Sequence, residues 1–177
     1  MKLEPLFTVK NNELYKIADN SKVELKSEAL NQIHADKLVF TDDSFCKVLI
    51  PWSKVELDEE VYNEEFLAAL RDFLKLYDEK NHFVIIKPIV DKDLSTPEAV
   101  ELFINAFNHT ARRIKDCVSV AGIELPPQLI EKGFAPATPA ADFMEKLAIK
   151  HQQYVYFAEK TLCGNTAETE LSSIVLL

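Results

Sequence analysis

Two hydrophobic patterns alternate through the middle of the chain, and this alternation constrains the fold more than any other feature. Near-continuous apolar runs, typical of buried strands, occur at "DKLVF", "CKVLIPW", "HFVIIKPIV", "VSVAGIEL" and "YVYFAE". Segments with a helical period separate the last four of these runs. Parallel neighbouring strands need crossover connections, which are usually helices. The pattern therefore predicts an α/β fold with a mostly parallel sheet and covering helices.

Local signals predict where the helices begin and end. Asn63 can cap the first helix, which we expect to end near Asn81. The second helix opens at Ser95-Thr96-Pro97-Glu98, where proline suits the first turn, and the third is "DFMEKLAIKHQ". We expect one face of the first helix to pack on the sheet, with these apolar residues: Phe66, Leu67, Leu70, Phe73, Leu74 and Tyr77.

The two ends of the chain differ from its middle. Residues 1–26 hold short alternating runs broken by turn-forming residues, which predicts a small N-terminal β-hairpin. Residues 27–160 carry the β/α units, and residues 161–177 form a tail whose "ETELSSIVLL" is apolar and β-branched. We predict a single domain in which this tail covers a sheet edge, either as a strand of its own sheet or as a strand exchanged with a second copy in a homodimer.

Composition excludes several classes of function. The net charge is −9, and the 20 basic residues form no patch, so we expect no nucleic-acid partner. No apolar run approaches the ~20 residues of a membrane span, and we expect no membrane association. Cys46, Cys117 and Cys163 lack metal-site spacing, which predicts no metal and free thiols of a cytoplasmic protein. No glycine-rich phosphate loop is present, so we expect no cofactor.

Parallel sheets carry their functional groups beyond the carboxyl ends of the strands. The residues at those positions are Trp52, Lys87, Asp91, Glu124 and Glu159. We predict that Lys87 and Asp91 bind substrate, and that the flat apolar face of Trp52 stacks on a sugar ring. The alternative for Trp52 is an ordinary core residue.

Glu124 is the strongest of these candidates for a functional residue, because it ends an apolar strand. Val118, Val120, Gly122 and Glu124 share one strand face, so Glu124 points into the mouth of the sheet if the valines fill its interior. Glu159 ends the next strand. Neighbouring strands lie ~4.8 Å apart, so the two carboxylates could reach the ~5–5.5 Å separation used by retaining glycosidases as a catalytic pair. The alternative is two solvated strand-end acids that limit edge association.

A family resemblance runs through residues 7–159. "VLIPWSKVELDEEVYNEEFLAALRDFLKLYDEKNHFVIIKPIVD" resembles the second and third strand-helix units of cellulase-like (β/α)8 barrels, glycoside hydrolase family 5. "AFNHTARRIKDCVSVAGIELP" is similar to the third helix and fourth strand of that family, and "FTVKNNELYKIADNSKVELKSEALNQI" is similar to its N-terminal hairpin and first strand. The resemblance implies a partial TIM-barrel-like fold and a carbohydrate ligand.

The chain departs from that family at its catalytic positions. Leu49 occupies the place of an arginine, Lys87-Pro88-Ile89 follows where a histidine is usual, and Pro126-Pro127 replaces the Asn-Glu pair that holds the acid/base. Glu124 would match a non-catalytic glutamate four residues earlier, and the nucleophile belongs on a seventh strand that these residues do not reach. We expect a shortened, degenerate relative that binds carbohydrate or hydrolyses it weakly through Glu124 and Glu159. The alternative is a non-catalytic scaffold that self-associates through its sheet edge.

Overall fold

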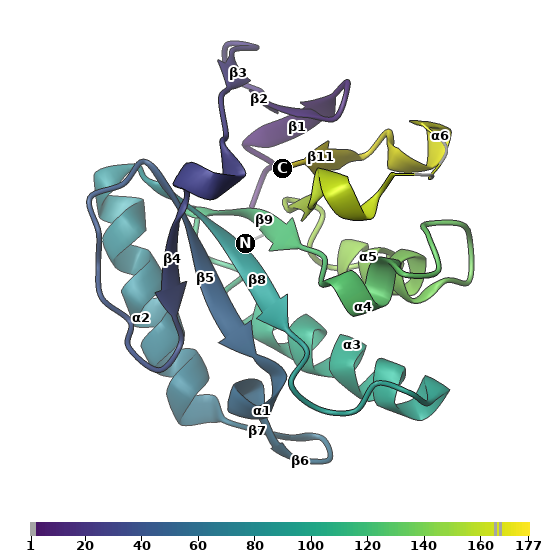
Figure 1. Cartoon of the computed structure of the whole chain (residues 1–177). Coiled ribbons are helices and arrows are strands. Elements are labelled where there is room, and N and C mark those ends of the chain that lie inside the picture. The colour runs from purple at the N-terminus through teal and green to yellow at the C-terminus, as the bar shows by residue number, and fades with distance from the viewer. Residues whose placement is uncertain (1–2, 165, 167) are drawn as a thin grey trace.

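The computed structural model describes residues 3–164, 166 and 168–177. Within them, the centre of the molecule is a six-stranded, all-parallel sheet in the order β11-β10-β9-β8-β5-β4 (Figure 1). Its strands are β4 (Asn31–His34), β5 (Phe45–Pro51), β8 (Phe83–Ile89), β9 (Val120–Glu124), β10 (Val155–Ala158) and β11 (Ile174–Leu176). The predicted α/β class with a parallel sheet is confirmed.

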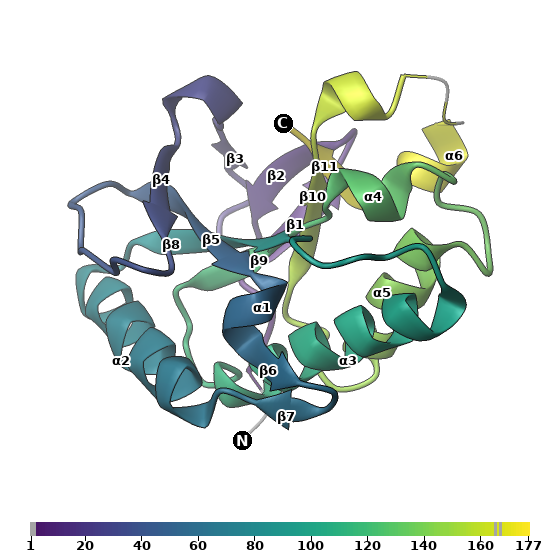
Figure 2. The same ribbon diagram turned by 60° about the horizontal axis from the view of Figure 1, so that its bottom comes forward.

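Three long helices cover one face of this sheet: α2 (Glu64–Lys80), α3 (Pro97–Arg113) and α5 (Pro139–Ala148) (Figure 2). Their apolar faces and the sheet enclose the main core, and the predicted face of α2 is buried throughout. The shorter elements are η1 (Ser27–Ala29), α1 (Trp52–Val55), β6 (Glu56–Asp58), β7 (Val61–Tyr62), α4 (Pro127–Ile130), η2 (Lys160–Leu162) and α6 (Glu168–Leu171).

The helix starts follow their capping residues. The Asn63 side chain accepts a hydrogen bond from the Phe66 amide at 3.1 Å, and Thr96 accepts one from the Ala99 amide at 3.1 Å. Asn81 ends α2 in a left-handed conformation with φ of 54°. The third helix begins three residues earlier than predicted, because Thr138 caps it and Pro139 occupies its first turn.

The predicted N-terminal hairpin is part of a three-stranded antiparallel sheet of β1 (Phe7–Lys10), β2 (Glu13–Lys16) and β3 (Lys22–Val23). It covers the sheet face opposite the helices, which we name the interior face. The Phe7 ring meets those of Phe45 and Phe83 at 5.9 and 4.8 Å between centroids. Because Phe45 and Phe83 begin their strands, this small sheet closes the amino-terminal end of the interior face.

Residues 36–40, "DKLVF", were predicted as a strand, and this prediction is wrong. The strand β4 lies just before them, and these residues form the connection to β5. Leu38 and Phe40 pack on the main core instead, with the Phe40 ring 4.8 Å from that of Tyr77, while Val39 is exposed. Apolar content alone does not separate a strand from a loop that covers a helix.

A bulge in β9 changes which residues share a face. Val84 pairs with Val120, but Ile85 pairs with Gly122, so the register shifts by one residue. Val120 therefore packs in the helix-side core, while Ala121 contributes to the interior face. Val118 precedes the strand and is exposed. The predicted common face of Val118, Val120, Gly122 and Glu124 is thus wrong.

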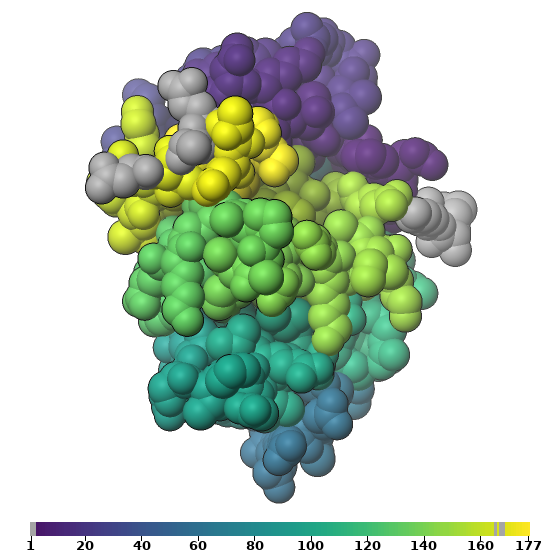
Figure 3. Space-filling model, turned by 90° about the vertical axis from the view of Figure 1, so that its right-hand side faces the viewer, coloured from purple at the N-terminus to yellow at the C-terminus, as the bar shows by residue number. Residues whose placement is uncertain are grey.

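The C-terminal residues supply the sixth strand, β11, as the intramolecular alternative predicted. The outward side of β11 meets the β1–β2 turn, where the Leu176 amide donates to the Asn12 carbonyl oxygen at 3.0 Å. The Asn12 side-chain amide donates to the Ile174 and Leu171 carbonyl oxygens at 2.9 and 2.5 Å. Figure 3 shows the N-terminal sheet and the C-terminal segment side by side on the surface.

Candidate functional site

Four charged side chains from four strands or strand ends meet on the interior face. The Lys47 Nζ lies 2.8 Å from Glu124 Oε2, and the Lys87 Nζ lies 2.8 Å from Glu124 Oε1. Lys87 also contacts Glu159 Oε1 at 3.2 Å. We name Lys47, Lys87, Glu124 and Glu159 the strand-end cluster.

Strand geometry brings these side chains together. On β5, Cys46 and Val48 pack in the helix-side core, so Lys47 between them projects from the interior face. Lys87 follows the same alternation on β8, where Ile86 faces the helices. Glu124 is the last residue of β9, and Glu159 directly follows β10, the parallel neighbour of β9. Glu124 and Glu159 thus lie at one edge of the sheet, and their carboxylates meet the lysines that project from within β5 and β8 on the same face.

Burial divides the cluster into an inner and an outer part. The side chains of Lys47 and Glu124 are each 2% exposed, whereas those of Lys87 and Glu159 are 16% and 39% exposed. Lys47 also donates to the Ser27 hydroxyl at 3.2 Å. Burial disfavours the charge of Lys87, but its hydrogen bonds and charge interactions with Glu124 and Glu159 outweigh this and raise its pKa. Lys87 and Glu159 are therefore the members that a ligand can reach, and Lys87 is an ammonium ion.

The interpretation of Glu124 as a solvated strand-end acid is wrong. Its carboxylate is buried and receives two ammonium groups, because a buried charge is stable only with partners. Glu159 is partly exposed, and Lys87 joins it to Glu124. The structure thus brings the two predicted carboxylates into one cluster with the predicted lysine between them.

Trp52 and Asp91 lie apart from this cluster. The Trp52 ring is 2% exposed, packs edge-on against Phe103 and donates through Nε1 to Glu56 at 2.6 Å. The core alternative thus describes Trp52, and the predicted sugar-stacking role is not supported because neither ring face is open. Asp91 accepts hydrogen bonds from the amide and hydroxyl of Ser53, at the start of α1. It stabilises that turn in this structure.

Sequence reasoning missed Lys47. A signal for it exists, since Lys47 and Lys87 are the cations within the otherwise apolar runs "CKVLIPW" and "HFVIIKPIV". Charged residues are rarely buried unless they are paired. Two lysines in neighbouring buried strands predict a buried carboxylate beside them.

The strand-end cluster offers charged hydrogen-bond donors and acceptors. The partly exposed ammonium and carboxylate groups of Lys87 and Glu159 can donate to and accept from polar ligands. Among the described residues, no group of three His, Cys, Asp or Glu side chains is arranged to hold a metal ion. Nor does any described helix have the length and apolar character needed to cross a bilayer.

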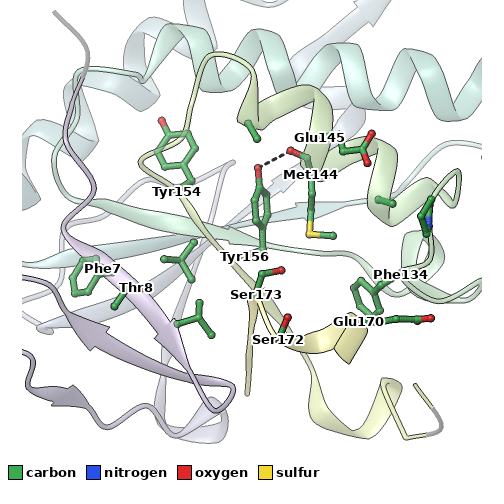
Figure 4. A pocket seen from close by; sticks show the side chains of 15 residues that line it. Phe7, Thr8, Phe134, Met144, Glu145, Tyr154, Tyr156, Glu170, Ser172 and Ser173 are labelled. Atoms are coloured by element: carbon green, nitrogen blue, oxygen red, sulfur yellow. Dashed lines mark hydrogen bonds between the residues drawn. The ribbon is translucent and has the colours of Figure 1, made fainter. Parts of the chain in front are cut away.

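A separate cavity of about 640 Å³ lies near the start of β10, between β1, α5 and the segment that leads into β11 (Figure 4). Tyr156 lines it and donates its hydroxyl hydrogen to the Met144 carbonyl oxygen at 3.2 Å. Glu145 and Glu170 add carboxylates to its wall. It lies at the opposite end of β10 from Glu159, so it is distinct from the strand-end cluster.

Solved structures of other proteins resemble this chain in fold, whereas comparison of sequences finds no match. Neither a protein-family model nor a curated sequence matches the chain. Endo-glycoceramidase II from Rhodococcus sp., in complex with a cellobiose-like isofagomine, aligns with a TM-score of 0.59 and 14% identity over 88% of this chain and 52% of that chain. Its lactosyl-enzyme intermediate aligns with a TM-score of 0.57 over the same shares.

The likeness is one of fold. At 14% identity it does not carry an activity, and the chain spans about half the length of that enzyme. It does show the predicted partial TIM-barrel-like fold, since the described sheet and helices align with about half of that enzyme. A further structure of the same enzyme aligns over 65% of this chain and 40% of that chain, with a TM-score of 0.50.

Proposed function

We propose that the protein binds carbohydrate at the strand-end cluster and does not hydrolyse it. The observation that carries this proposal is the partly exposed pair of Lys87 and Glu159, joined at 3.2 Å at the carboxyl ends of the central strands. Ligands of such sheets bind at this edge. An ammonium and a carboxylate side by side can donate to and accept from neighbouring sugar hydroxyls.

The inner pair positions the outer one. Glu124 holds the Lys87 ammonium at 2.8 Å, and Lys47 compensates the charge of Glu124 from the other side. The Lys87 side chain is thus already oriented before a ligand binds, and this lowers the entropic cost of binding.

Hydrolysis fits this arrangement poorly. A retaining glycosidase uses one carboxyl as a proton donor and a second as a free nucleophile. Here both carboxylates already contact a lysine, and Glu124 contacts two. In the resemblance to cellulase-like barrels, Pro126 and Pro127 also stand where that family has the Asn-Glu pair that holds its acid/base.

Calorimetric titration with lactose and cello-oligosaccharides tests the proposal. We expect saturable binding that weakens about tenfold in Lys87→Met and in Glu159→Gln, since each loses a charged hydrogen bond. Glu145→Gln, which alters the cavity of Figure 4, is the matched control and should bind like the unmodified protein.

Three outcomes would contradict the proposal. One is the absence of binding to any of these sugars. Another is binding that is lost in Glu145→Gln but kept in Lys87→Met, which would move the site to the cavity. The third is turnover of β-glucan or aryl glycosides that Glu124→Gln or Glu159→Gln abolishes, because this would establish a catalytic pair.

A further inference from the structure

A pocket of about 340 Å³ lies in the helix layer, away from the interior face of the sheet. Its walls come from the β6–β7 turn, the last turns of α3 and the segment after α5. Polar residues dominate it, and the four that matter here are Asn108, Arg112, Lys150 and His151. We name it the basic pocket.

Unpaired polar atoms are concentrated in this pocket. Asn108 Oδ1 and both ring nitrogens of His151 are buried, and they have no hydrogen-bond partner among the described residues. His151 is only 3% exposed. Because a buried polar atom without a partner costs free energy, these atoms call for a partner that the described residues do not supply, such as an ion or a polar ligand.

The charge of the pocket is positive, although the whole chain carries −9. Arg112 and Lys150 line it, and neither forms an ion pair with a carboxylate of the described residues. Glu60 is the acidic lining residue and offsets one of these two charges. The remaining local excess attracts anions.

Neighbouring residues hold Arg112 in place. Its Nη2 lies 2.9 Å from His109 Nδ1, while His109 Nε2 lies 2.7 Å from Glu64 and the Tyr62 ring stacks on the imidazole at 4.0 Å. Burial is the main cause of a lowered His109 pKa, which favours the neutral ring that accepts from Arg112. One edge of the guanidinium is thus fixed, and its other N–H groups stay available.

We propose that the basic pocket binds a small oxyanion, such as a phosphate or carboxylate group, through Arg112, Lys150 and His151. The guanidinium fork matches the geometry of an oxyanion, and the Lys150 ammonium adds a second charge. The His151 ring supplies a buried donor, and the Asn108 amide can contact a hydroxyl or oxygen of the same ligand. This site is independent of carbohydrate binding at the strand-end cluster.

Titration of the full chain with inorganic phosphate, at constant ionic strength in a phosphate-free buffer, tests the site. We expect saturable binding with amide NMR shifts confined to Asn108, Arg112, Lys150 and His151. Arg112→Gln should weaken binding about tenfold, because a charged hydrogen bond is lost. Arg112 is exposed, so this variant should fold normally.

Arg113→Gln is the matched control. Arg113 is the next residue of α3, pairs with Glu64 at 2.9 Å and does not line the pocket, so its variant should bind phosphate like the unmodified protein. A parallel titration with acetate distinguishes a phosphate from a carboxylate ligand, and preference for either supports an oxyanion site. No saturable binding of either anion, or equal weakening in both arginine variants, would overturn the proposal.

Discussion

At the scale of single residues, the fold depends on the charged side chains that lie inside buried strands. The side chains of Lys47 and Glu124 are both 2% exposed, and their ion pair lies at 2.8 Å on the interior face. Taking two charges out of water costs roughly several kcal/mol per ion, and their attraction offsets this cost only while both are present. Each therefore depends on the other for its place in the fold.

Lys47→Met tests this dependence. We expect it to lower the free energy of unfolding by about 3 kcal/mol, because Glu124 then keeps a buried charge with Lys87 alone. The double variant Lys47→Met/Glu124→Gln should recover part of this loss. The measurement is equilibrium unfolding in urea.

Lys54→Met is the control for the loss of a lysine charge. Lys54 pairs with the exposed Asp36 at 3.1 Å, so its loss should cost less than about 1 kcal/mol. Equally small losses in Lys47→Met and Lys54→Met would show that the buried pair does not stabilise the fold.

At the scale of elements, the close approach of β9 to β10 is the contact that most restricts the sequence. A methyl group added at Gly122 would lie 1.8 Å from the Val155 carbonyl oxygen and 2.9 Å from a Phe157 ring carbon. The backbone of β10 approaches so closely that only glycine fits there. The same strands carry Glu124 and Glu159, so this contact also determines the geometry of the strand-end cluster.

Gly122→Ala should therefore separate the two strands. We expect a destabilisation of at least about 3 kcal/mol, at the upper end of overpacking costs, since the obstacle is backbone. Thermal unfolding followed by circular dichroism measures it. Gly164→Ala is the control, because a methyl group there meets no atom of the described residues within 4 Å. A normal midpoint for Gly122→Ala would show that β9 and β10 do not approach as described.

The first and last parts of the described chain meet at the scale of the whole molecule. Through Asn12, the β1–β2 turn binds the outward-facing Leu176 amide and the Ile174 carbonyl oxygen of edge strand β11. Exposed edges invite pairing with other chains, and here a turn covers those groups. The predicted homodimer through this edge remains a prediction, and it would have to break these bonds.

Asn12→Gly tests whether the β1–β2 turn protects the edge of β11. Glycine accepts the φ of 60° at this position and keeps the backbone bond to Leu176, but it loses the two side-chain hydrogen bonds. We expect destabilisation by about 1–2 kcal/mol and greater self-association, measured by urea unfolding and light scattering.

Asn11→Gly provides the comparison. Asn11 has a similar φ of 51° in the same turn and makes no such bonds to β11. It should behave like the unmodified chain. Equal stability and equal mass for both variants would show that the Asn12 side chain does not protect the edge.

Local chemistry was sufficient to predict much of this protein from its sequence. Hydrophobic periodicity and capping residues act within a few positions, so the α/β class, the cap of α2 at Asn63 and the strand-end places of Glu124 and Glu159 could be read directly. The positions of the C-terminal strand and the N-terminal hairpin followed from the same patterns.

Tertiary structure decided what depends on residues far apart in the chain. The bulge in β9 turned Val120 toward the helices, and the register of β5 against its neighbours brought Lys47 to Glu124. The unpaired atoms of His151 and Asn108 came together through packing of the segment after α5 against α3. Such pairings arise from strand register and packing between elements, which a local pattern does not encode.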